Sequence, residues 1–305
     1  MAAAITNTVL DAAPGIALTI AGSGFGASGT VTLSNQGVTS LPALSPTTIT
    51  LSQVSWSPTT ITVNVPDGVM DGTLTVKAQD ASTATAALRS CSQYVTSTEY
   101  TNAGEGVDLS SFATGELDAL LKRASGYADA YMGNSLRQLQ LLEQHKYRTK
   151  QNQPPRVYPW RTRGRRVPII SIDQLTFVSA KGLVTAFNTT DMYVNTSLNC
   201  VEILAYAIGN YALLGALEII GYSANVLELS FTSGYPMASY PNEVRAAVTT
   251  IATELVTYRK IQSLGLGGLS KVRQGTQQYE RRQEPFQIPD QAKDLLSPFI
   301  ARALA

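Results

Sequence analysis

The stretch Pro14-Gly-Ile-Ala-Leu-Thr-Ile-Ala-Gly-Ser-Gly-Phe-Gly26 decides the fold of the first third of the chain. Its apolar side chains Ile16, Leu18 and Ile20 recur with the period of two that is typical of a strand with one buried face. The glycines between Gly22 and Gly26 predict a tight β-turn, because glycine readily adopts positive φ. A β-pattern and no helix follows, so a turn is favoured over a dinucleotide-binding loop.

The same alternation continues to about residue 90 and predicts a β-sandwich. Threonine and serine occupy the intervening positions, and Gly- and Pro-containing turn signals separate the runs. The further apolar positions of these strands are Val31, Leu33, Ile49, Leu51, Ile61, Val63, Val65, Leu74 and Val76.

Together with Val54-Ser-Trp-Ser57, Ile61-Thr-Val-Asn-Val-Pro66 and Gly72-Thr-Leu-Thr-Val76, the opening stretch resembles the IPT/TIG family of immunoglobulin-like domains. The resemblance covers most of residues 10–90 and implies a binding or spacer module and no enzyme. We expect Trp56 and Phe25 to be core aromatics and not a carbohydrate-stacking surface.

The character of the sequence changes near residue 95. The preceding part has only two basic residues, Lys77 and Arg89, whereas helical, basic and β-like segments follow. We therefore expect a multidomain protein, with an all-β immunoglobulin-like sandwich followed by an α-helical connector domain that has a β-rich insertion and an extended C-terminal tail. The predicted parts are a sandwich at 1–92, a linker at 93–113, a helical domain at 114–268 and a tail at 269–305.

Two helices are predicted for the helical domain. The first follows Thr114 as N-cap, carries Glu116 and Asp118 in its first turn and ends at Gly133. The second opens at Pro241. Their apolar stripes are Leu117, Leu120, Leu121, Ala124, Tyr127, Ala128 and Tyr131, and Val244, Ala247, Val248, Ile251, Ala252, Leu255 and Tyr258.

Between these helices we expect a β insertion at 169–235. Leucines at 136–142 indicate either a continuation of the first helix or a second short element. Residues 207–220 read as a buried helix, and a short amphipathic helix at 289–305 is expected to bend at Pro298. The predicted strands span 169–175, 183–187, 192–194, 200–204 and 226–231.

A basic arm at 144–172 contains eight lysines and arginines and no acidic residue. Pro154, Pro155 and Pro159 exclude a regular helix through its middle, so the arm is expected to be extended. It has three interpretations: a lining that meets DNA phosphates, a grip on an acidic protein surface, or a solvated loop. Aromatic residues and prolines between the arginines favour protein contact.

Composition argues against several functions. The net charge is +1, the two cysteines have no metal-ligand spacing, and His145 is the single histidine. We expect no cofactor, no metal and no membrane segment, and the N-terminus lacks the pattern of a secretory signal. An enzyme that pairs Asp173, Asp191, Glu202 or Glu228 as acid and base remains an alternative without a supporting motif.

Glu116-Leu-Asp-Ala-Leu-Leu-Lys-Arg-Ala-Ser125, Tyr240-Pro-Asn-Glu-Val-Arg-Ala-Ala-Val248 and the polar segment up to Tyr279 together resemble the head–tail connector, or adaptor, proteins of tailed bacteriophages. The resemblance covers residues 110–282. It implies a structural virion protein in the neck, assembled in the host cytoplasm, that forms a dodecameric ring beneath the portal. The ring joins capsid to tail, and its channel passes the DNA.

The partners implied are the portal protein, further copies of the chain, a tail completion or tail-terminator protein, and packaged DNA through non-specific contact. The candidate residues for portal or subunit binding are Arg156, Arg161, Arg163, Arg165, Arg166, Arg273, Tyr279, Arg281, Arg282, Leu295, Leu296 and Phe299. Intramolecular packing is the alternative for the last three. The alternative function is a phage decoration or host-adhesion protein that binds glycans through the sandwich.

Overall fold

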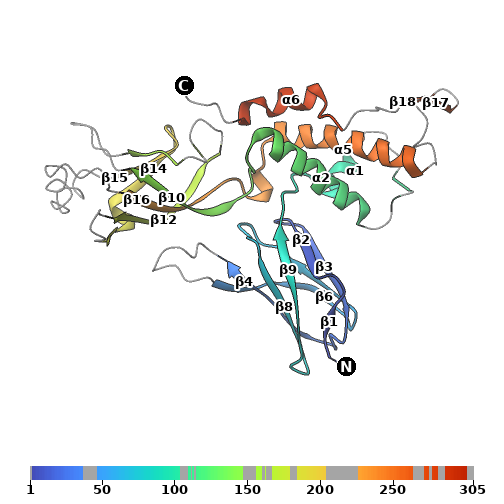
Figure 1. Cartoon of the computed structure of the whole chain (residues 1–305), viewed down its shortest axis with the longest axis horizontal. Coiled ribbons are helices and arrows are strands. Elements are labelled where there is room, and N and C mark those ends of the chain that lie inside the picture. The colour runs from blue at the N-terminus through green and yellow to red at the C-terminus, as the bar shows by residue number, and fades with distance from the viewer. Residues whose placement is uncertain are drawn as a thin grey trace. The chain divides into compact units, whose positions relative to one another are not determined.

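The computed structural model describes residues 2–36, 47–103, 109–110, 112, 115–146, 156–159, 162, 167–178, 184–203, 226–263, 271–274, 277–280 and 286–300. The described chain is predominantly β, with several sheets and few helices (Figure 1). Two compact units are distinguished. One contains residues 1–90, 136–236 and 301–305, and the other contains residues 91–135 and 237–300.

The N-terminal strands form the predicted sandwich of two sheets. One sheet has the order β1-β3-β7-β6, and the other has the order β2-β9-β8-β4-β5. All strand pairs are antiparallel except β2 with β9, which is parallel. The strands are β1 (Ala4–Ile5), β2 (Val9–Ala12), β3 (Ala17–Ser23), β4 (Gly29–Gln36), β5 (Thr47–Thr50), β6 (Gln53–Trp56), β7 (Thr60–Asn64), β8 (Gly72–Ala78) and β9 (Thr83–Ser90).

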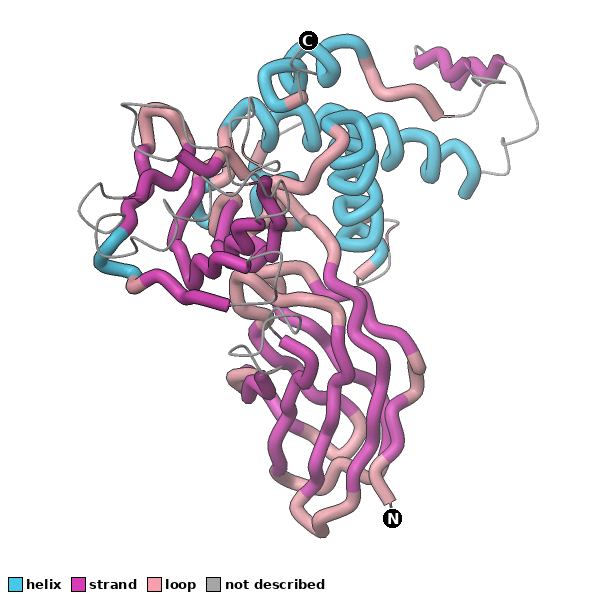
Figure 2. Tube along the Cα trace, turned by 60° about the vertical axis from the view of Figure 1, so that its left-hand side comes forward, coloured by secondary structure: helices cyan, strands magenta, loops and turns pink. Residues whose placement is uncertain are grey.

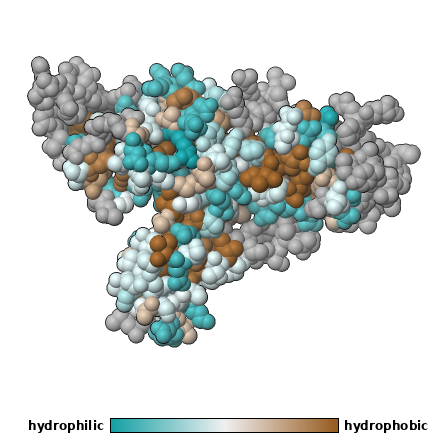
Figure 3. All heavy atoms as spheres, turned by 180° about the vertical axis from the view of Figure 1, so that it is seen from behind, coloured by the Kyte–Doolittle hydropathy of each residue, from teal (hydrophilic) through white to brown (hydrophobic). Residues whose placement is uncertain are grey.

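The alternation in the sequence explains the sandwich core. The side chains of Ile20, Val31, Leu33, Ile61 and Leu74 are fully buried, while the residues between them face outward. Those outward residues are mostly threonine, serine and alanine, and Figure 3 shows a sandwich surface of mainly intermediate hydropathy.

The two aromatic residues of the sandwich lie as predicted. Phe25 is fully buried in the core, and Trp56 is partly buried and packs against it. Their rings meet edge to face at a centroid distance of 6.4 Å, and Trp56 Nε1 donates to the Phe25 carbonyl at 3.3 Å. Gly24 and Gly26 have φ near +70°, which confirms the predicted positive φ, and they lie in the irregular connection from β3 to β4.

The segment 136–236 holds a second β structure. A four-stranded antiparallel sheet has the order β10-β16-β12-β13, and a small antiparallel sheet has the order β11-β15-β14. Their elements are β10 (Leu139–Lys146), β11 (Arg156–Val157), β12 (Ile169–Val178), β13 (Val184–Phe187), η1 (Thr189–Asp191), β14 (Met192–Asn195), β15 (Cys200–Ile203) and β16 (Val226–Ser233). The five predicted strands of this region are confirmed.

These two sheets share one hydrophobic core. Phe177, Leu229 and Phe231 from the larger sheet and Val201 and Ile203 from the smaller sheet belong to it. The leucines at 136–142 form no helix, because residues 139–146 pair along their length with β16 as an edge strand. The predicted helix at 207–220 lies outside the described residues.

The second unit contains the described α-helices, which Figure 2 shows in cyan. They are α1 (Ser97–Asn102), α2 (Glu116–Met132), α5 (Asn242–Ser263) and α6 (Asp290–Leu296), with η2 (Met237–Ser239) and η3 (Ser297–Phe299). Helix α2 packs against α5, and α6 contacts both. The hairpin of β17 (Lys271–Gln274) and β18 (Gln277–Glu280) follows α5.

The predicted helix boundaries are partly confirmed. Gly133 is the C-cap of α2 with φ of 66°, and α6 ends before Pro298. The predicted N-cap Thr114 is wrong, because Gly115 occupies that position with φ of 85° and makes no side-chain cap bond. Of the predicted stripes, Leu121, Ala124, Ala128, Val244, Ala247, Val248, Ile251, Ala252 and Leu255 are buried.

The segment predicted as a linker contributes to the helical core. Tyr94 and Tyr100 are buried, and Tyr94 meets the Tyr240 ring edge to face at 4.8 Å. Thr96 begins α1 with a capping box, in which its side chain accepts from Glu99 N and Glu99 accepts from Thr96 N. Residues 91–103 are therefore folded against the helices.

Candidate functional site

The small sheet holds a polar cluster around Glu202, whose side chain is only 5% exposed. Its carboxylate accepts from Arg156 Nε at 2.7 Å, from Asn195 Nδ2 at 2.9 Å and from the Tyr193 hydroxyl. The register explains the cluster, because Glu202 on β15 lies opposite Arg156 on β11 and Tyr193 on β14.

These contacts keep Glu202 ionised. The hydrogen bond from Tyr193 lowers the pKa of the Glu202 carboxyl, and those from Asn195 and Arg156 lower it further, against the effect of desolvation. The same contacts raise the pKa of Tyr193 and of the Arg156 guanidinium. A carboxylate held by three donors is suited to fixing side chains and not to transferring protons.

Asn199 forms a second polar centre next to this sheet. Its Nδ2 donates to the carbonyls of Thr162 at 3.1 Å and Val167 at 2.8 Å, and its Oδ1 accepts from Ile169 N at 3.3 Å. Thr162 and Val167 are fully buried. One amide side chain thus holds described residues on both sides of positions 163–166. Asn199 itself has φ of 50°, a conformation that asparagine tolerates better than most residues.

The predicted binding residues are distributed over several elements. Arg156 lies in β11 and is paired with Glu202, while Arg273 and Tyr279 lie in the two strands of the hairpin. Leu296 and Phe299 are buried, so intramolecular packing accounts for both, and Leu295 is half-buried. Arg161, Arg163, Arg165, Arg166, Arg281 and Arg282 lie outside the described residues.

Three of the carboxylates considered for acid–base chemistry, Asp173, Glu202 and Glu228, have separate partners. Asp173 accepts from Gln140, Ser171 and Thr232, and Glu228 accepts from Gln144 at 2.7 Å. In the described part of the chain, no group of three or more His, Cys, Asp or Glu side chains is arranged to hold a metal ion. Both cysteines are free thiols, and burial raises the pKa of Cys200.

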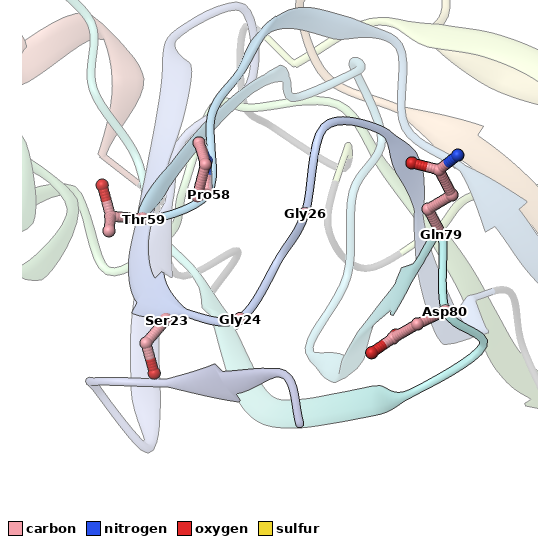
Figure 4. A pocket seen from close by; sticks show the side chains of 7 residues that line it. All are labelled: Ser23, Gly24, Gly26, Pro58, Thr59, Gln79 and Asp80. Atoms are coloured by element: carbon pink, nitrogen blue, oxygen red, sulfur yellow. The ribbon is translucent and has the colours of Figure 1, made fainter. Parts of the chain in front are cut away.

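A hollow of about 570 Å³ lies at one end of the sandwich (Figure 4). It is lined by Ser23, Gly24, Gly26, Pro58, Thr59, Gln79 and Asp80. The sequence pattern indicated turns at the glycines and at Ser57-Pro58 but not a common hollow, because only the strand pairing brings the three loops together.

No protein-family model and no curated protein matches the chain. Among solved structures, a γ-CGTase from an alkalophilic Bacillus clarkii is 22% identical over 30% of this chain and 12% of its own, with a TM-score of 0.23. A DUF4784 family protein from Bacteroides caccae is 13% identical over 29% and 23%, with a TM-score of 0.21.

A third structure, SGBP-B of a Bacteroides ovatus mixed-linkage glucan utilization locus in complex with a heptasaccharide, is 10% identical over 75% of this chain and 52% of its own. Its TM-score is 0.21. Since this chain spans 12% to 52% of the three structures at such TM-scores, they assign neither family nor function. No helix within the described residues is long and apolar enough to cross a membrane.

Proposed function

We propose that this protein is a head–tail adaptor of a tailed bacteriophage, a structural virion protein that forms a ring beneath the portal and joins the capsid to the tail. The observation that carries the proposal is the pairing of α2 with α5 in one core, although the whole β segment 136–236 lies between them in sequence. An early and a late helix separated by a β insertion are what the adaptor resemblance implies.

The packing of the helical unit supports an assembly role. Leu121 and Ala124 of α2 and Val248 and Ile251 of α5 are fully buried, which fixes the two helices. An ion pair between Arg259 and Glu116 at 2.7 Å also links α5 to α2, and one between Arg245 and Glu99 links α5 to α1. A self-contained helical core leaves the hairpin and the basic arm available to contact the portal, a tail protein or a second copy of the chain.

The β segment supports protein contact rather than catalysis. Glu202 and Asn199 hold the described residues of the basic arm by hydrogen bonds, and the Glu202 carboxylate is engaged by three donors. An arm whose ends are fixed loses less conformational entropy when it binds an acidic protein surface. A ring of head-to-tail contacts closes naturally when each copy offers the same two surfaces.

Immunogold electron microscopy on phage particles tests the location. With antibodies against residues 1–92, gold at the head–tail junction supports the adaptor. Gold on the capsid shell or tail tip contradicts it and favours decoration or host adhesion.

Reconstitution with the purified portal tests the contact. The triple substitution Arg163→Glu/Arg165→Glu/Arg166→Glu should abolish assembly onto the portal. The control Lys77→Glu alters an exposed basic residue of the sandwich and should leave assembly intact. Unchanged assembly of the triple variant rejects the arm as the contact surface.

A further inference from the structure

The hollow at the end of the sandwich is formed by three connecting loops. They join β3 to β4, β6 to β7 and β8 to β9, and the register places all three at the same end of the domain, because Ala21 lies opposite Thr60 and Gly29 lies opposite Ala78. Loops gathered at one end of a rigid sandwich commonly carry binding residues. The volume of about 570 Å³ falls within the roughly 300–1,000 Å³ of small-molecule sites.

The walls of the hollow are fixed by hydrogen bonds. Phe25 N donates to the Pro58 carbonyl at 3.2 Å, and Gly22 N donates to the Thr59 carbonyl at 2.8 Å, which ties two of the loops together. The third loop is braced by Ala78 N, which donates to the Ser82 carbonyl at 2.9 Å. The hollow is therefore preformed, and little ordering is needed on binding.

The rim carries groups that bind hydroxyls. Asp80 Oδ1 accepts both the Ser82 N–H at 2.9 Å and the Ser82 hydroxyl at 2.6 Å, and this side-chain bond lowers the pKa of Asp80. The carboxylate therefore remains an acceptor at neutral pH. Gln79, Thr59 and Ser23 add exposed amide and hydroxyl groups, as Figure 4 shows.

One wall of the hollow is formed by glycine backbone without side chains. Gly24 and Gly26 have φ near +70°, a conformation strained for other residues, so no side chain covers the wall at these two positions. The exposed Pro58 ring gives an apolar surface opposite the polar rim. An apolar wall beside several hydrogen-bonding groups matches the two kinds of surface that a sugar ring presents.

We propose that this hollow binds a neutral saccharide, with Asp80 and Gln79 hydrogen-bonded to its hydroxyls and Pro58 and the glycine backbone against its ring. The lining has no cationic side chain to bind phosphate or carboxylate groups. It has one carboxylate, which is too few for a divalent cation that takes six or more oxygen ligands.

The affinity for a single sugar is expected to be weak. The lining contains no aromatic ring. Phe25 is buried in the core, and the Trp56 ring packs against that core and donates from Nε1 to the Phe25 carbonyl. A few exposed hydrogen bonds correspond to a Kd on the order of 1–10 mM. Several copies in one assembly would raise the avidity without any new contact. The site does not depend on the adaptor proposal.

Saturation-transfer difference NMR on the full-length protein tests this site. The probes are methyl glycosides of glucose, galactose and mannose, with methylammonium as the cationic comparison. At least one glycoside should receive saturation, and Gln79→Ala/Asp80→Ala should weaken its binding by at least about tenfold. Asp67→Ala, at the opposite end of the sandwich, should bind as the parent does. Thr59→Trp should block the hollow while leaving the Asp80–Ser82 bonds intact.

Each outcome decides the proposal. Binding of a glycoside that is lost in both hollow variants and kept in Asp67→Ala supports it. Asp80→Asn should retain part of that binding, because an amide oxygen still accepts from a hydroxyl. The proposal is overturned if no glycoside binds, if binding survives Thr59→Trp, or if methylammonium competes with the glycoside and Asp80→Asn abolishes both.

Discussion

Substitutions of Tyr94 test whether residues 91–95 belong to the core of the helical unit or form a linker. The side chain is fully buried, its hydroxyl donates to Asp129, and its backbone N–H donates to Ser125 Oγ at 3.0 Å. A buried tyrosine removes about 200 Å² from water, which at about 25 cal/mol/Å² corresponds to about 5 kcal/mol. The bond to the Asp129 carboxylate adds about 1.5–3 kcal/mol.

Two substitutions separate the contribution of the Tyr94 hydroxyl to the free energy of unfolding from that of its ring. Tyr94→Phe keeps the ring and should cost about 2 kcal/mol, because it removes one bond while Ser92 Oγ still donates to Asp129 at 2.5 Å. Tyr94→Ala should cost about 5 kcal/mol, because the edge-to-face contact with Tyr240 is also lost. This is less than the sum of the two contributions above, since alanine keeps part of the buried area and the area-based value is an upper bound.

Urea unfolding followed by circular dichroism at 222 nm is the assay, because the described α-helices all lie in this unit. With a slope of about 2 kcal/mol/M, the midpoint should fall by about 1 M for Tyr94→Phe and by about 2.5 M for Tyr94→Ala. The control is Thr101→Ala at an exposed position of α1, which should leave the midpoint nearly unchanged. A loss below about 1 kcal/mol for Tyr94→Ala would refute the assignment of residues 91–95 to the core.

Phe299→Ala should lower the stability of the helical unit by about 3–5 kcal/mol, and the half-buried Leu295→Ala by clearly less; equal losses in urea unfolding would contradict the burial difference. Asn199→Ala should be less stable than Asn199→Gly by about 1 kcal/mol in thermal unfolding. Both variants lose the side-chain hydrogen bonds, but only alanine is strained at φ of 50°. A more stable alanine variant would contradict the left-handed conformation of residue 199. The pKa of Glu202 is lowered on folding, so its stabilising contribution is present above the unfolded pKa near 4.5 and is lost as pH falls through the folded pKa. The difference in melting temperature between the parent and Glu202→Gln should accordingly be largest at neutral pH and shrink in acid, and a difference independent of pH would contradict it.

Local periodicity was sufficient for most strands and for the two long helices. It predicted β3, β4, β7 and β8, where alternate residues are buried, and also the five strands of the insertion, of which β15 is buried at all four positions. It missed β6, where residues 53–55 are exposed and pairing with β7 decides the conformation. It left the leucines at 136–142 open between a continuation of the first helix and a second short element, and pairing with β16 makes residues 139–146 a strand.

The candidate sites depended on long-range contacts and were therefore less visible. Arg156 was selected as a binding residue for its charge, but Glu202, its partner across the small sheet, was considered only as an unsupported acid. Asn199 and the loops around Asp80 have no motif in the sequence. Only strand register brings Thr162, Val167 and Asn199 together, and the same holds for the residues of the hollow.

The parallel pairing of β2 with β9 has a mechanical consequence. Val9 to Ala12 lie beside Ala87 to Ser90, and β9 leads directly into the helical unit. A force that pulls on the chain before Val9 and after Ser90 acts on opposite ends of two parallel strands, so it loads their hydrogen bonds in shear and all at once. Such a ladder resists tension better than one that opens bond by bond. The hydrogen bonds between β2 and β9 therefore lie directly in the path of a force applied between these two points.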